Sequence, residues 1–525
     1  MVAQTLAAGT PGFPAVVTGP VLEWQDRWLD QPHPLAGAVI YDRGQTPLFR
    51  TAFIVEHGAK ALLMAAGGKN YHPLILAAEA GLPAIAGIGQ VDLPVGRQVA
   101  VDAGAGRVYT APPPLAAATA PAITTSIAAG LPAVYVNVGY PSALPAAATG
   151  AAGLGLLRTE FAAVKTLALH LGQRLDDGRC WRELLEQAGG NEADAIYAIA
   201  IDRRGQTLLK AGFHDVVAAA VGCFGEREVI VRTLDIARHL DEPMGNRGIR
   251  RCVGSGGATL RLLCEAIREV LEERGGHIGL ILPLVSHYSQ IRATMEQVLA
   301  SGLALQRPGS TAHRQIRFGW EIEQPAAAHN NALWLAAFTA EFGQPPHLLG
   351  IGTNDLTQFT IALGRDVYAA EADAALADYL RTLYDEHEFS VVSQILEAAA
   401  QCRAVGTRVF LLGQAGADPL LAPLLFAARI TPSVAPARIG EVQQMARASL
   451  QPGAAAKAID AYRDWVLAAY PPAARTAVAR ELETFFLATL PPIKLDSTGL
   501  PGTPASSGRP VQPRAKFKSG RLPAK

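Results

Sequence analysis

The chain has 525 residues, half of them hydrophobic, which is too long for one ordinary core and predicts two or three domains. Its 46 basic and 46 acidic residues balance, which argues against a surface that binds nucleic acid or another polyanion. No uninterrupted apolar run approaches the roughly 20 residues that span a bilayer, and the first residues lack the basic start and apolar segment of a secretory signal. Five scattered cysteines without CxxC spacing favour reduced thiols. We therefore expect a soluble cytoplasmic protein without membrane or nucleic-acid partners.

The first 110 residues alternate short apolar runs with glycines, as in "AGAVIYDRG", "ALLMAAGG" and "LPAIAGIG". The stretch "GRQVAVDAGAGRVYTA" then has the pattern of a strand, a turn and a second strand. This predicts a small β-rich domain over residues 1–110. Within it, "GGKNYHPLILAAEAGLPAIAG" places His72 between a glycine pair and the first turns of a predicted helix.

A linker is predicted over residues 111–130, because "PPPLAAATAPAITT" contains little but prolines and small residues. From 131 to about 440, β-type runs that end in polar or charged residues alternate with helical stretches. Eight such runs predict a (β/α)8 barrel of the α/β class. They are "AVYVNVG", "LGLLRTE", "EVIVRTLD", "IGLILPLVS", "IRFGWEIE", "HLLGIGTND", "RVFLLGQA" and "ARITPSVAP".

Beyond the barrel, three helical patterns predict a C-terminal helical extension over residues 441–493, which would pack on the barrel or on a second subunit. The last residues are rich in proline, glycine and serine and carry many more basic than acidic side chains. We expect a disordered basic tail over residues 494–525.

Functional residues of such barrels lie at the C-terminal ends of the strands. The candidates there are Arg158, Arg232, Glu323, Asn354 and Asp355.

Further arginines, Arg247, Arg250 and Arg365, follow strands in the chain. A guanidinium is costly to bury without an anion, so an anionic ligand would explain them. The alternative is that the arginines pair with neighbouring acids such as Glu160 and Asp235.

Two of the candidate acids, Glu323 and Asp355, end neighbouring strands, so their carboxylates could converge at the barrel mouth. Two carboxylates together with waters and ligand oxygens suit Mg²⁺. The alternative is a pair of solvated or capping acids.

Four segments, "GLGLLRTEF", "VIVRTLDI", "EIEQPAA" and "GIGTNDLTQFTIALGRD", closely resemble the phosphoenolpyruvate-utilising enzymes: enzyme I of the sugar phosphotransferase system, pyruvate phosphate dikinase and phosphoenolpyruvate synthase. The segment around His72 resembles the phosphohistidine motif of their swivelling domain. The resemblance runs from about residue 35 to 440, in the family's domain order. It implies a β/β/α swivelling phosphohistidine domain followed by a TIM barrel that binds phosphoenolpyruvate or pyruvate. It also implies Mg²⁺ as cofactor. We further expect a homodimer formed through the barrel.

Matching the motifs residue by residue implies ligand contacts at the barrel mouth. Arg158, Arg232 and Arg365 resemble the phosphate-binding arginines of the family. Arg247 matches another arginine of the ligand pocket, and Asn354 resembles the contact to the substrate carboxylate.

The same comparison implies that Glu323 and Asp355 are Mg²⁺ ligands and that His72 is the phosphoacceptor. A phosphorylated imidazole at a helix N-terminus would face backbone N–H groups and the positive end of the helix. Gly67 and Gly68 would let the backbone turn tightly before it. The alternative is a structural histidine with its own hydrogen bonds.

The chain departs from the family in two places. After strand seven the family carries Cys-Gly-Glu or Cys-Gly-Gln, whose cysteine protonates the enolate carbon, but here "LLGQAGAD" has Leu412 in that place. Cys402 lies ten residues earlier in a helical stretch and is expected in the core. A family segment after strand three is shortened, and the candidates to replace its lysine are Arg238 and His239.

Three hypotheses follow. The first is a Mg²⁺-dependent phosphotransferase that moves the phosphoryl group of phosphoenolpyruvate to His72 and on to an unknown phosphoryl acceptor. We expect the acceptor to stay undefined, because the dikinase's nucleotide domain and enzyme I's carrier-docking insert have no counterpart in the sequence. The second is a catalytically reduced regulatory protein that binds phosphoenolpyruvate or pyruvate, which Leu412 favours. The third, by fold analogy alone, is a barrel lyase acting on an enolpyruvate-like substrate.

Overall fold

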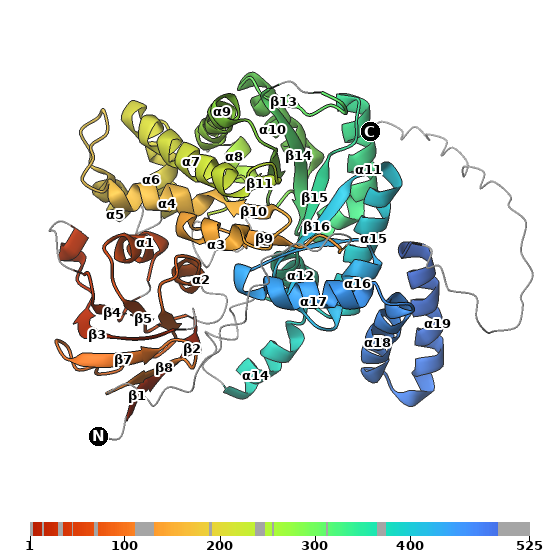
Figure 1. Cartoon of the computed structure of the whole chain (residues 1–525), viewed down its shortest axis with the longest axis horizontal. Helices are drawn as coiled ribbons and strands as arrows, with labels where there is room; N and C mark the ends of the chain where they lie inside the picture. Colours follow the sequence, from red (N-terminus) through yellow and green to blue (C-terminus); the bar gives the residue numbers. More distant parts are fainter. Residues whose placement is uncertain are drawn as a thin grey trace, which may run out of the picture.

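A computed structural model shows an N-terminal β-rich domain, a closed parallel barrel wrapped by helices, and helices that follow the barrel (Figure 1). The predicted linker, the predicted tail and the residues Arg238, His239 and Arg365 lie outside the residues that the structure describes. Those described residues are 4–12, 15–29, 35–44, 46–67, 72–110, 131–187, 192–236, 247–254, 257–310, 313–364 and 374–491.

The N-terminal domain is an eight-stranded mixed sheet with the order β1-β8-β7-β3-β4-β5-β6-β2. The predicted strand, turn and strand are confirmed as β7 and β8, which pair antiparallel. The strands are β1 (Thr5–Ala8), β2 (Thr10–Pro11), β3 (Val16–Glu23), β4 (Val39–Asp42), β5 (Ala61–Met64), β6 (Ala84–Ala86), β7 (Gln98–Asp102) and β8 (Arg107–Tyr109).

Two helices and a 3-10 turn, η1 (Asp26–Leu29), connect these strands. The helix predicted after the glycine pair is confirmed, since α2 (His72–Glu79) begins at His72. Helix α1 (Leu48–Glu56) was not predicted: its sequence, "LFRTAFIVE", is rich in β-branched and aromatic residues, and packing overrides that local preference.

The predicted barrel is confirmed. Its strands are all parallel, in the order β12-β11-β10-β9-β17-β16-β15-β14, and pairing of β12 with β14 closes the ring. A short strand, β13 (Ala304–Leu305), extends the sheet beside β14. The barrel strands are β9 (Tyr135–Val138), β10 (Leu154–Arg158), β11 (Val229–Arg232), β12 (Ile278–Leu282), β14 (Gln315–Ile322), β15 (Leu348–Gly352), β16 (Arg408–Leu412) and β17 (Thr431–Val434).

Helices surround the barrel and follow it. The three helical patterns predicted near the C-terminus are confirmed as α17, α18 and α19. In chain order the elements are η2 (Pro141–Ala143), α3 (Leu144–Ala148), α4 (Thr159–Leu169), α5 (Trp181–Gln187), α6 (Glu192–Ile199), α7 (Arg203–Phe224), α8 (Ile249–Val253), α9 (Gly257–Arg274), α10 (Tyr288–Ala300), α11 (Pro325–Phe342), α12 (Thr353–Ile361), α14 (Ala374–Leu383), α15 (Phe389–Val405), η3 (Gln414–Ala417), α16 (Leu421–Ala427), η4 (Pro436–Arg438), α17 (Ile439–Ser449), α18 (Ala454–Ala468) and α19 (Pro472–Thr489).

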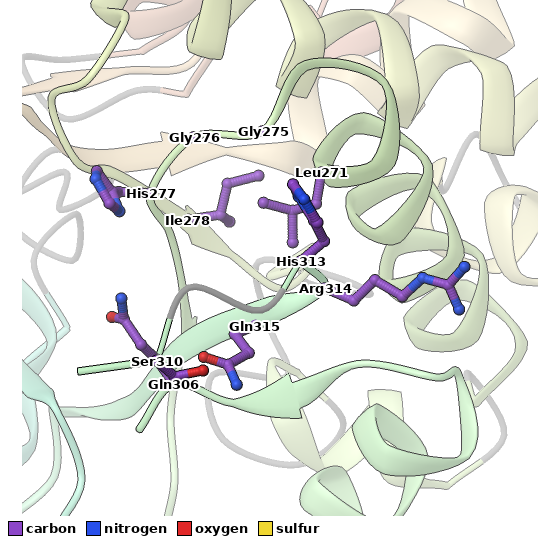
Figure 2. A pocket seen from close by; sticks show the side chains of 10 residues that line it. All are labelled: Leu271, Gly275, Gly276, His277, Ile278, Gln306, Ser310, His313, Arg314 and Gln315. Atoms are coloured by element: carbon purple, nitrogen blue, oxygen red, sulfur yellow. The ribbon is translucent and has the colours of Figure 1, made fainter. Parts of the chain in front are cut away.

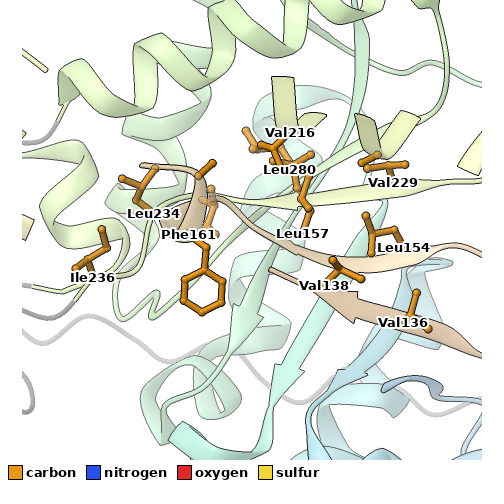
Figure 3. Packing of buried hydrophobic residues seen from close by; sticks show 14 of the residues in the cluster. Val136, Val138, Leu154, Leu157, Phe161, Val216, Val229, Leu234, Ile236 and Leu280 are labelled. Atoms are coloured by element: carbon orange, nitrogen blue, oxygen red, sulfur yellow. The ribbon is translucent and has the colours of Figure 1, made fainter. Parts of the chain in front are cut away.

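Side chains on the barrel strands alternate between two apolar layers, as the two-residue period of a strand requires. The outer layer packs against the helices and includes Val136, Leu157, Val229 and Leu280 (Figure 3). The inner cluster fills the lumen with Tyr135, Leu156, Ile230, Ile281, Leu348, Phe410 and Leu412. The lumen is therefore a packed core and not a pore.

An ion cluster closes the N-terminal end of the barrel. The buried Glu228 carboxylate accepts hydrogen bonds from Arg317 Nη1 at 2.6 Å and from Arg408 Nη1 and Nη2 at 2.8 and 2.6 Å. Burial acts to raise the pKa of Glu228, but the two guanidinium groups outweigh it and lower that pKa below its usual value. The apolar middle of the barrel separates this cluster from the charged side chains at the C-terminal ends of the strands.

The N-terminal domain packs on the flank of the barrel through α1, which lies against α4. Glu56 at the end of α1 accepts a hydrogen bond from the Tyr140 hydroxyl and pairs with Lys165 Nζ at 2.8 Å. At the start of α1, Phe49 N donates to Glu192 Oε1 at 3.3 Å. Both ends of the helix are thus tied to the barrel.

One helix among the described residues, α7, is long and apolar enough to cross a membrane by length and composition. It packs against α4 and α9 in the barrel wall, and residues such as Phe213 and Val217 along it are fully buried. A core helix of this kind meets the same criterion, so the feature is weak evidence for a span.

Candidate active site

The predicted site residues within the described part of the barrel lie at the C-terminal ends of its strands. Arg158 ends β10 and Arg232 ends β11, and the two are partners in the register of this parallel pair. Glu323 follows the last residue of β14. Asn354 and Asp355 lie in the first turn of α12, directly after β15.

Arg232 is buried and sits among acids. Its Nη2 pairs closely with Glu160 and lies 3.7 Å from Asp235 Oδ2, while its Nη1 lies 3.7 Å from Glu321 Oε2. Burial acts to lower the pKa of Arg232, but the surrounding carboxylates, Glu160 first, outweigh it and raise that pKa well above its usual value. The guanidinium is therefore always charged, and the pairing with Glu160 and Asp235 that the sequence left open is present.

Arg247 links two carboxylates at the mouth. Its Nε and Nη2 donate to Asp235 at 2.8 and 2.9 Å, and its Nη1 and Nη2 donate to the two oxygens of Asp355 at 3.2 Å each. Gln358 Nε2 adds a hydrogen bond of 3.0 Å to Asp355 Oδ1. The structure thus brings together two predicted residues, Arg247 and Asp355, through an arginine fork on a carboxylate.

Glu323, the other predicted metal ligand, is 4% exposed and accepts a hydrogen bond of 2.7 Å from Leu284 N through Oε2. Leu284 has a φ of +54°, an uncommon conformation for a leucine, and its N–H points at the carboxylate. Burial, followed by repulsion from Glu321 and Asp355, raises the pKa of Glu323 well above its usual value. The acids around Glu323 therefore destabilise its ionised form.

Glu321 was missed by the sequence analysis. It is 1% exposed, and neither carboxylate oxygen has a hydrogen-bond partner in the structure. Burial raises its pKa to about 7, against the opposing effect of Arg232. The signal was present in "WEIE": two acids spaced two apart on a strand face the same side, so both Glu321 and Glu323 point into the barrel mouth.

The acidic cluster fits a divalent cation, because such an ion would neutralise the repulsion among Glu321, Glu323 and Asp355. Mg²⁺ keeps several waters and needs only one or two carboxylates, so Glu323 and Asp355 would suffice to hold it. In the part of the chain that the structure describes, no group of three or more His, Cys, Asp or Glu residues is arranged as a metal centre. A site here would therefore depend on water and ligand oxygens.

The floor of the mouth is apolar at Leu412. This residue ends β16, pairs in register with Gly352 and belongs to the inner barrel cluster. A Cβ placed on Gly350 would lie 2.6 Å from Leu412 Cδ1 and 3.1 Å from Glu321 Cγ, so these side chains meet beside that glycine. Cys402 is buried in α15, as expected, and burial raises its thiol pKa to about 12.

Two other predicted residues complete the mouth. Asn354 is half-buried, and its carbonyl accepts a hydrogen bond of 2.8 Å from the Tyr384 hydroxyl. Arg250, in α8, donates through Nε and Nη2 to Ser286 Oγ at 3.2 and 2.9 Å, in the loop that follows β12.

A cavity of about 200 Å³ lies at the opposite end of the barrel, where β12 and β14 begin (Figure 2). Its lining includes His277, Gln306, His313 and Gln315. None of the predicted site residues contributes to it, and it lies away from the strand ends where barrel chemistry takes place.

Comparison with known proteins identifies two family matches. Residues 116–450 match the PEP-binding domain of the PEP-utilising enzymes, and residues 45–106 match their mobile domain. A probable phosphoenolpyruvate synthase of Pyrococcus abyssi is 31% identical over 400 residues, covering 70% of this chain and 42% of that protein. A phosphoenolpyruvate-protein phosphotransferase of Streptomyces coelicolor is 27% identical over 394 residues, covering 70% of this chain and 58% of that protein.

A solved structure of an HpcH/HpaI aldolase/citrate lyase family protein from Burkholderia cenocepacia covers 46% of this chain and 77% of its own, with a TM-score of 0.27 and 14% identity, and supports no conclusion. The chain spans less than half the length of the Pyrococcus synthase that it matches. The match to the PEP-binding domain nevertheless covers more than half of the chain. The two matched domains follow one another in the order that the motifs predict, and the chain belongs to the family of PEP-utilising enzymes.

Proposed function

We propose that the chain is a Mg²⁺-dependent phosphotransferase that moves the phosphoryl group of phosphoenolpyruvate to His72 and from there to a second acceptor. The observation that carries the proposal is the cluster at the barrel mouth, where Arg232 and Arg247 lie among buried carboxylates. Family membership and the start of α2 at His72 support the same proposal.

In this proposal the arginines bind the ligand. Arg232 and Arg247 keep their charge at any physiological pH, because the acids around them raise their pKa values. Both would exchange part of their carboxylate contacts for phosphoryl oxygens, with Arg158 beside Arg232 in the strand register. Arg365 is proposed as a further phosphate contact, and Asn354 as the contact to the substrate carboxylate.

Glu323 and Asp355 are proposed as the metal ligands. Bound Mg²⁺ would offset the negative charge on the phosphoryl oxygens and orient the group for in-line attack. A neutral ring nitrogen of His72 would attack phosphorus, forming an N–P bond as the P–O bond of phosphoenolpyruvate breaks. The electron pair of the broken bond stays on the enolate oxygen, where the cationic arginines stabilise it.

Leu412 would slow the second half of the reaction, in which the enolate becomes pyruvate. Forming pyruvate places a proton on the enolate carbon, and a leucine has none to give. Enolpyruvate released to water can form pyruvate without the enzyme, so phosphorylation of His72 can proceed. The reverse direction, which must remove a proton from the methyl group of pyruvate, would be slow.

Leu412 also favours a second candidate function, that of a regulatory protein that binds phosphoenolpyruvate or pyruvate without turnover. Its side chain is packed into the inner barrel cluster, where it serves as core. In this case the mouth would bind ligand, but His72 would not become phosphorylated.

One experiment separates the two candidates. The protein is incubated with Mg²⁺ and phosphoenolpyruvate labelled in the phosphoryl group, and protein-bound label is tested for the acid lability and base stability of a phosphohistidine. We expect label in the unmodified protein and none in His72→Ala, with phosphoenolpyruvate binding to His72→Ala retained in calorimetry. Binding without any labelling of the unmodified protein would favour the regulatory function, and labelling of His72→Ala would refute the acceptor assignment.

The homodimer through the barrel stays a prediction for this chain. Light scattering coupled to gel filtration measures it directly, and a monomeric mass at micromolar concentration would contradict it.

A further inference from the structure

The segment "YDEHE", residues 384–388, joins α14 to α15 and has no role in the function proposed above. Its histidine, His387, lies between two carboxylates: Nδ1 is 2.6 Å from Asp385 Oδ1 and Nε2 is 3.0 Å from Asp418 Oδ1. A carboxylate accepts hydrogen bonds, so a ring held at both nitrogens donates from both and is the imidazolium. Hydrogen bonds to Asp385 and Asp418 accordingly raise the pKa of His387 to about 10.

The contact with Asp418 fixes the end of the segment that follows β16. Asp418 Oδ1 also accepts hydrogen bonds from Leu420 N at 2.8 Å and Leu421 N at 3.0 Å, at the start of α16. Between Leu412 and Asp418 the chain forms the short turn η3 (Gln414–Ala417). His387 thus holds the far end of the turn that leads out of the barrel floor.

The same segment holds the start of α12. The Tyr384 hydroxyl donates to the Asn354 carbonyl at 2.8 Å, and Thr353 Oγ1 donates to Glu386 Oε1 at 3.3 Å. Asp355, which accepts hydrogen bonds from Arg247, follows Asn354 in α12. Two loops of the barrel mouth, which come from neighbouring strands β15 and β16, therefore share one support.

A helix beyond the barrel covers this support from outside. In α18, the Tyr462 hydroxyl donates to the His387 carbonyl at 2.8 Å, and the Trp465 ring lies 5.4 Å from the His387 ring. Tyr462 is fully buried, and its ring stacks on Trp465. Helix α18 is thereby connected to the loops of the barrel mouth through its contacts with His387.

We propose that His387 is a positioning residue for phosphoryl transfer, which holds the loops after β15 and β16 in register with each other. The proposal rests on the function proposed above, since it assigns these loops to the phosphoenolpyruvate site. The competing account is that the Asp385–His387–Asp418 cluster only attaches α18 to the barrel.

The test uses three variants of the full chain. His387→Gln removes the cation between the carboxylates. Asp418→Asn breaks the charged contact but keeps a side-chain oxygen for the start of α16, because asparagine caps helices as well as aspartate does. Tyr462→Phe is the matched control, since it removes only the hydrogen bond from α18 to the His387 carbonyl.

Hydrogen exchange and single-turnover labelling of His72 are measured on each variant. We expect His387→Gln and Asp418→Asn to speed amide exchange in residues 353–358 and 413–420 and to slow labelling at saturating phosphoenolpyruvate about tenfold or more, because small misplacements at a reacting centre are costly. A further variant that combines His387→Gln with Asp418→Asn should label no more slowly than either single variant, because both substitutions remove the same contact. Tyr462→Phe should leave labelling unchanged.

Faster exchange confined to α18, or equal losses of labelling in all three variants, would overturn the proposal. If His387→Gln does not fold, Asp418→Asn decides the outcome alone. If the unmodified protein takes up no label, the proposed function fails, while the exchange pattern in the two mouth segments still decides whether His387 positions them.

Discussion

Arg247 grips Asp355 with two nitrogens, each 3.2 Å from a different carboxylate oxygen, although Asp355 is also one of the two residues proposed to bind Mg²⁺. A carboxylate held by a bidentate arginine has little remaining affinity for a cation. Binding of Mg²⁺ at Asp355 would therefore be linked to release of Arg247, and the released guanidinium would become available to an anionic ligand. Phosphoenolpyruvate and Mg²⁺ should accordingly strengthen each other's binding.

The variant Arg247→Lys tests this linkage. Lysine keeps the charge but cannot form the bidentate contact with Asp355. We expect Mg²⁺ alone to bind more tightly and phosphoenolpyruvate to bind about tenfold more weakly, since a hydrogen bond to a charged group contributes about 1.5 kcal/mol. Calorimetric titrations with each ligand alone and with both measure the two affinities. Weaker Mg²⁺ binding in the variant would show that Arg247 does not compete for Asp355.

The variants Glu323→Gln and Asp355→Asn should each abolish Mg²⁺-dependent binding of phosphoenolpyruvate, because a small hard cation loses half of its protein charge. The control is Glu341→Gln, which removes a surface acid paired with Tyr288 and Arg292 on the flank of the barrel. Near-ultraviolet circular dichroism checks that the fold survives. Unchanged Mg²⁺ affinity in both site variants would contradict the assignment of Glu323 and Asp355 as metal ligands.

The raised pKa of Glu321, about 7, predicts how stability depends on pH. Its folded pKa lies above the usual value of 4.5, so the stability that the protonated form contributes is complete below about pH 4.5 and is lost as pH rises through 7. Glu321→Gln removes this loss. In the absence of Mg²⁺ the variant should match the unmodified protein near pH 4.5 and exceed it at pH 8 by on the order of 3 kcal/mol.

Urea unfolding at the two pH values measures this difference. The groups that face Glu321 are Arg232, Glu323, Asp235 and Glu160, and none of them is substituted in the variant. Loss of the Glu321 charge also removes one of the causes that raise the pKa of Glu323. Saturating Mg²⁺ should reduce the advantage at pH 8, because a cation in the cluster stabilises the ionised acids. An advantage equal at both pH values would mean that the effect comes from packing and not from the charge of Glu321.

Leu412→Cys should restore proton exchange if the surrounding geometry has been kept. In the unmodified protein we expect slow wash-in of solvent deuterium into the methyl group of pyruvate, and the variant should raise that rate tenfold or more, as a positioned acid or base contributes about a hundredfold or more. Leu412→Ala is the control, since it opens the same space without a thiol. Rapid exchange in the unmodified protein would show that another residue supplies the proton.

Much of the fold could be predicted because its signals are local. The eight barrel runs each combine a short apolar stretch with a polar end, and every one forms a strand in the expected order. Four candidate site residues could be predicted because they end such runs, and strand ends meet at one face of a barrel. They are Arg158, Arg232, Glu323 and Asp355. Helix α1 could not be predicted, because its burial against α4 decides its conformation.

The residues that bring charge to the barrel mouth could thus be predicted, since their positions depend only on the period of a strand and the place where each run ends. Which of these charges meet depends on long-range packing. Arg247 and Asp355 are 108 residues apart, and closure of the ring by β12 and β14 brings their loops together. His387 joins Asp418 for the same reason, as β15 and β16 are neighbours in the barrel. Local pattern fixes the direction in which a side chain points, whereas its partner depends on how distant segments pack.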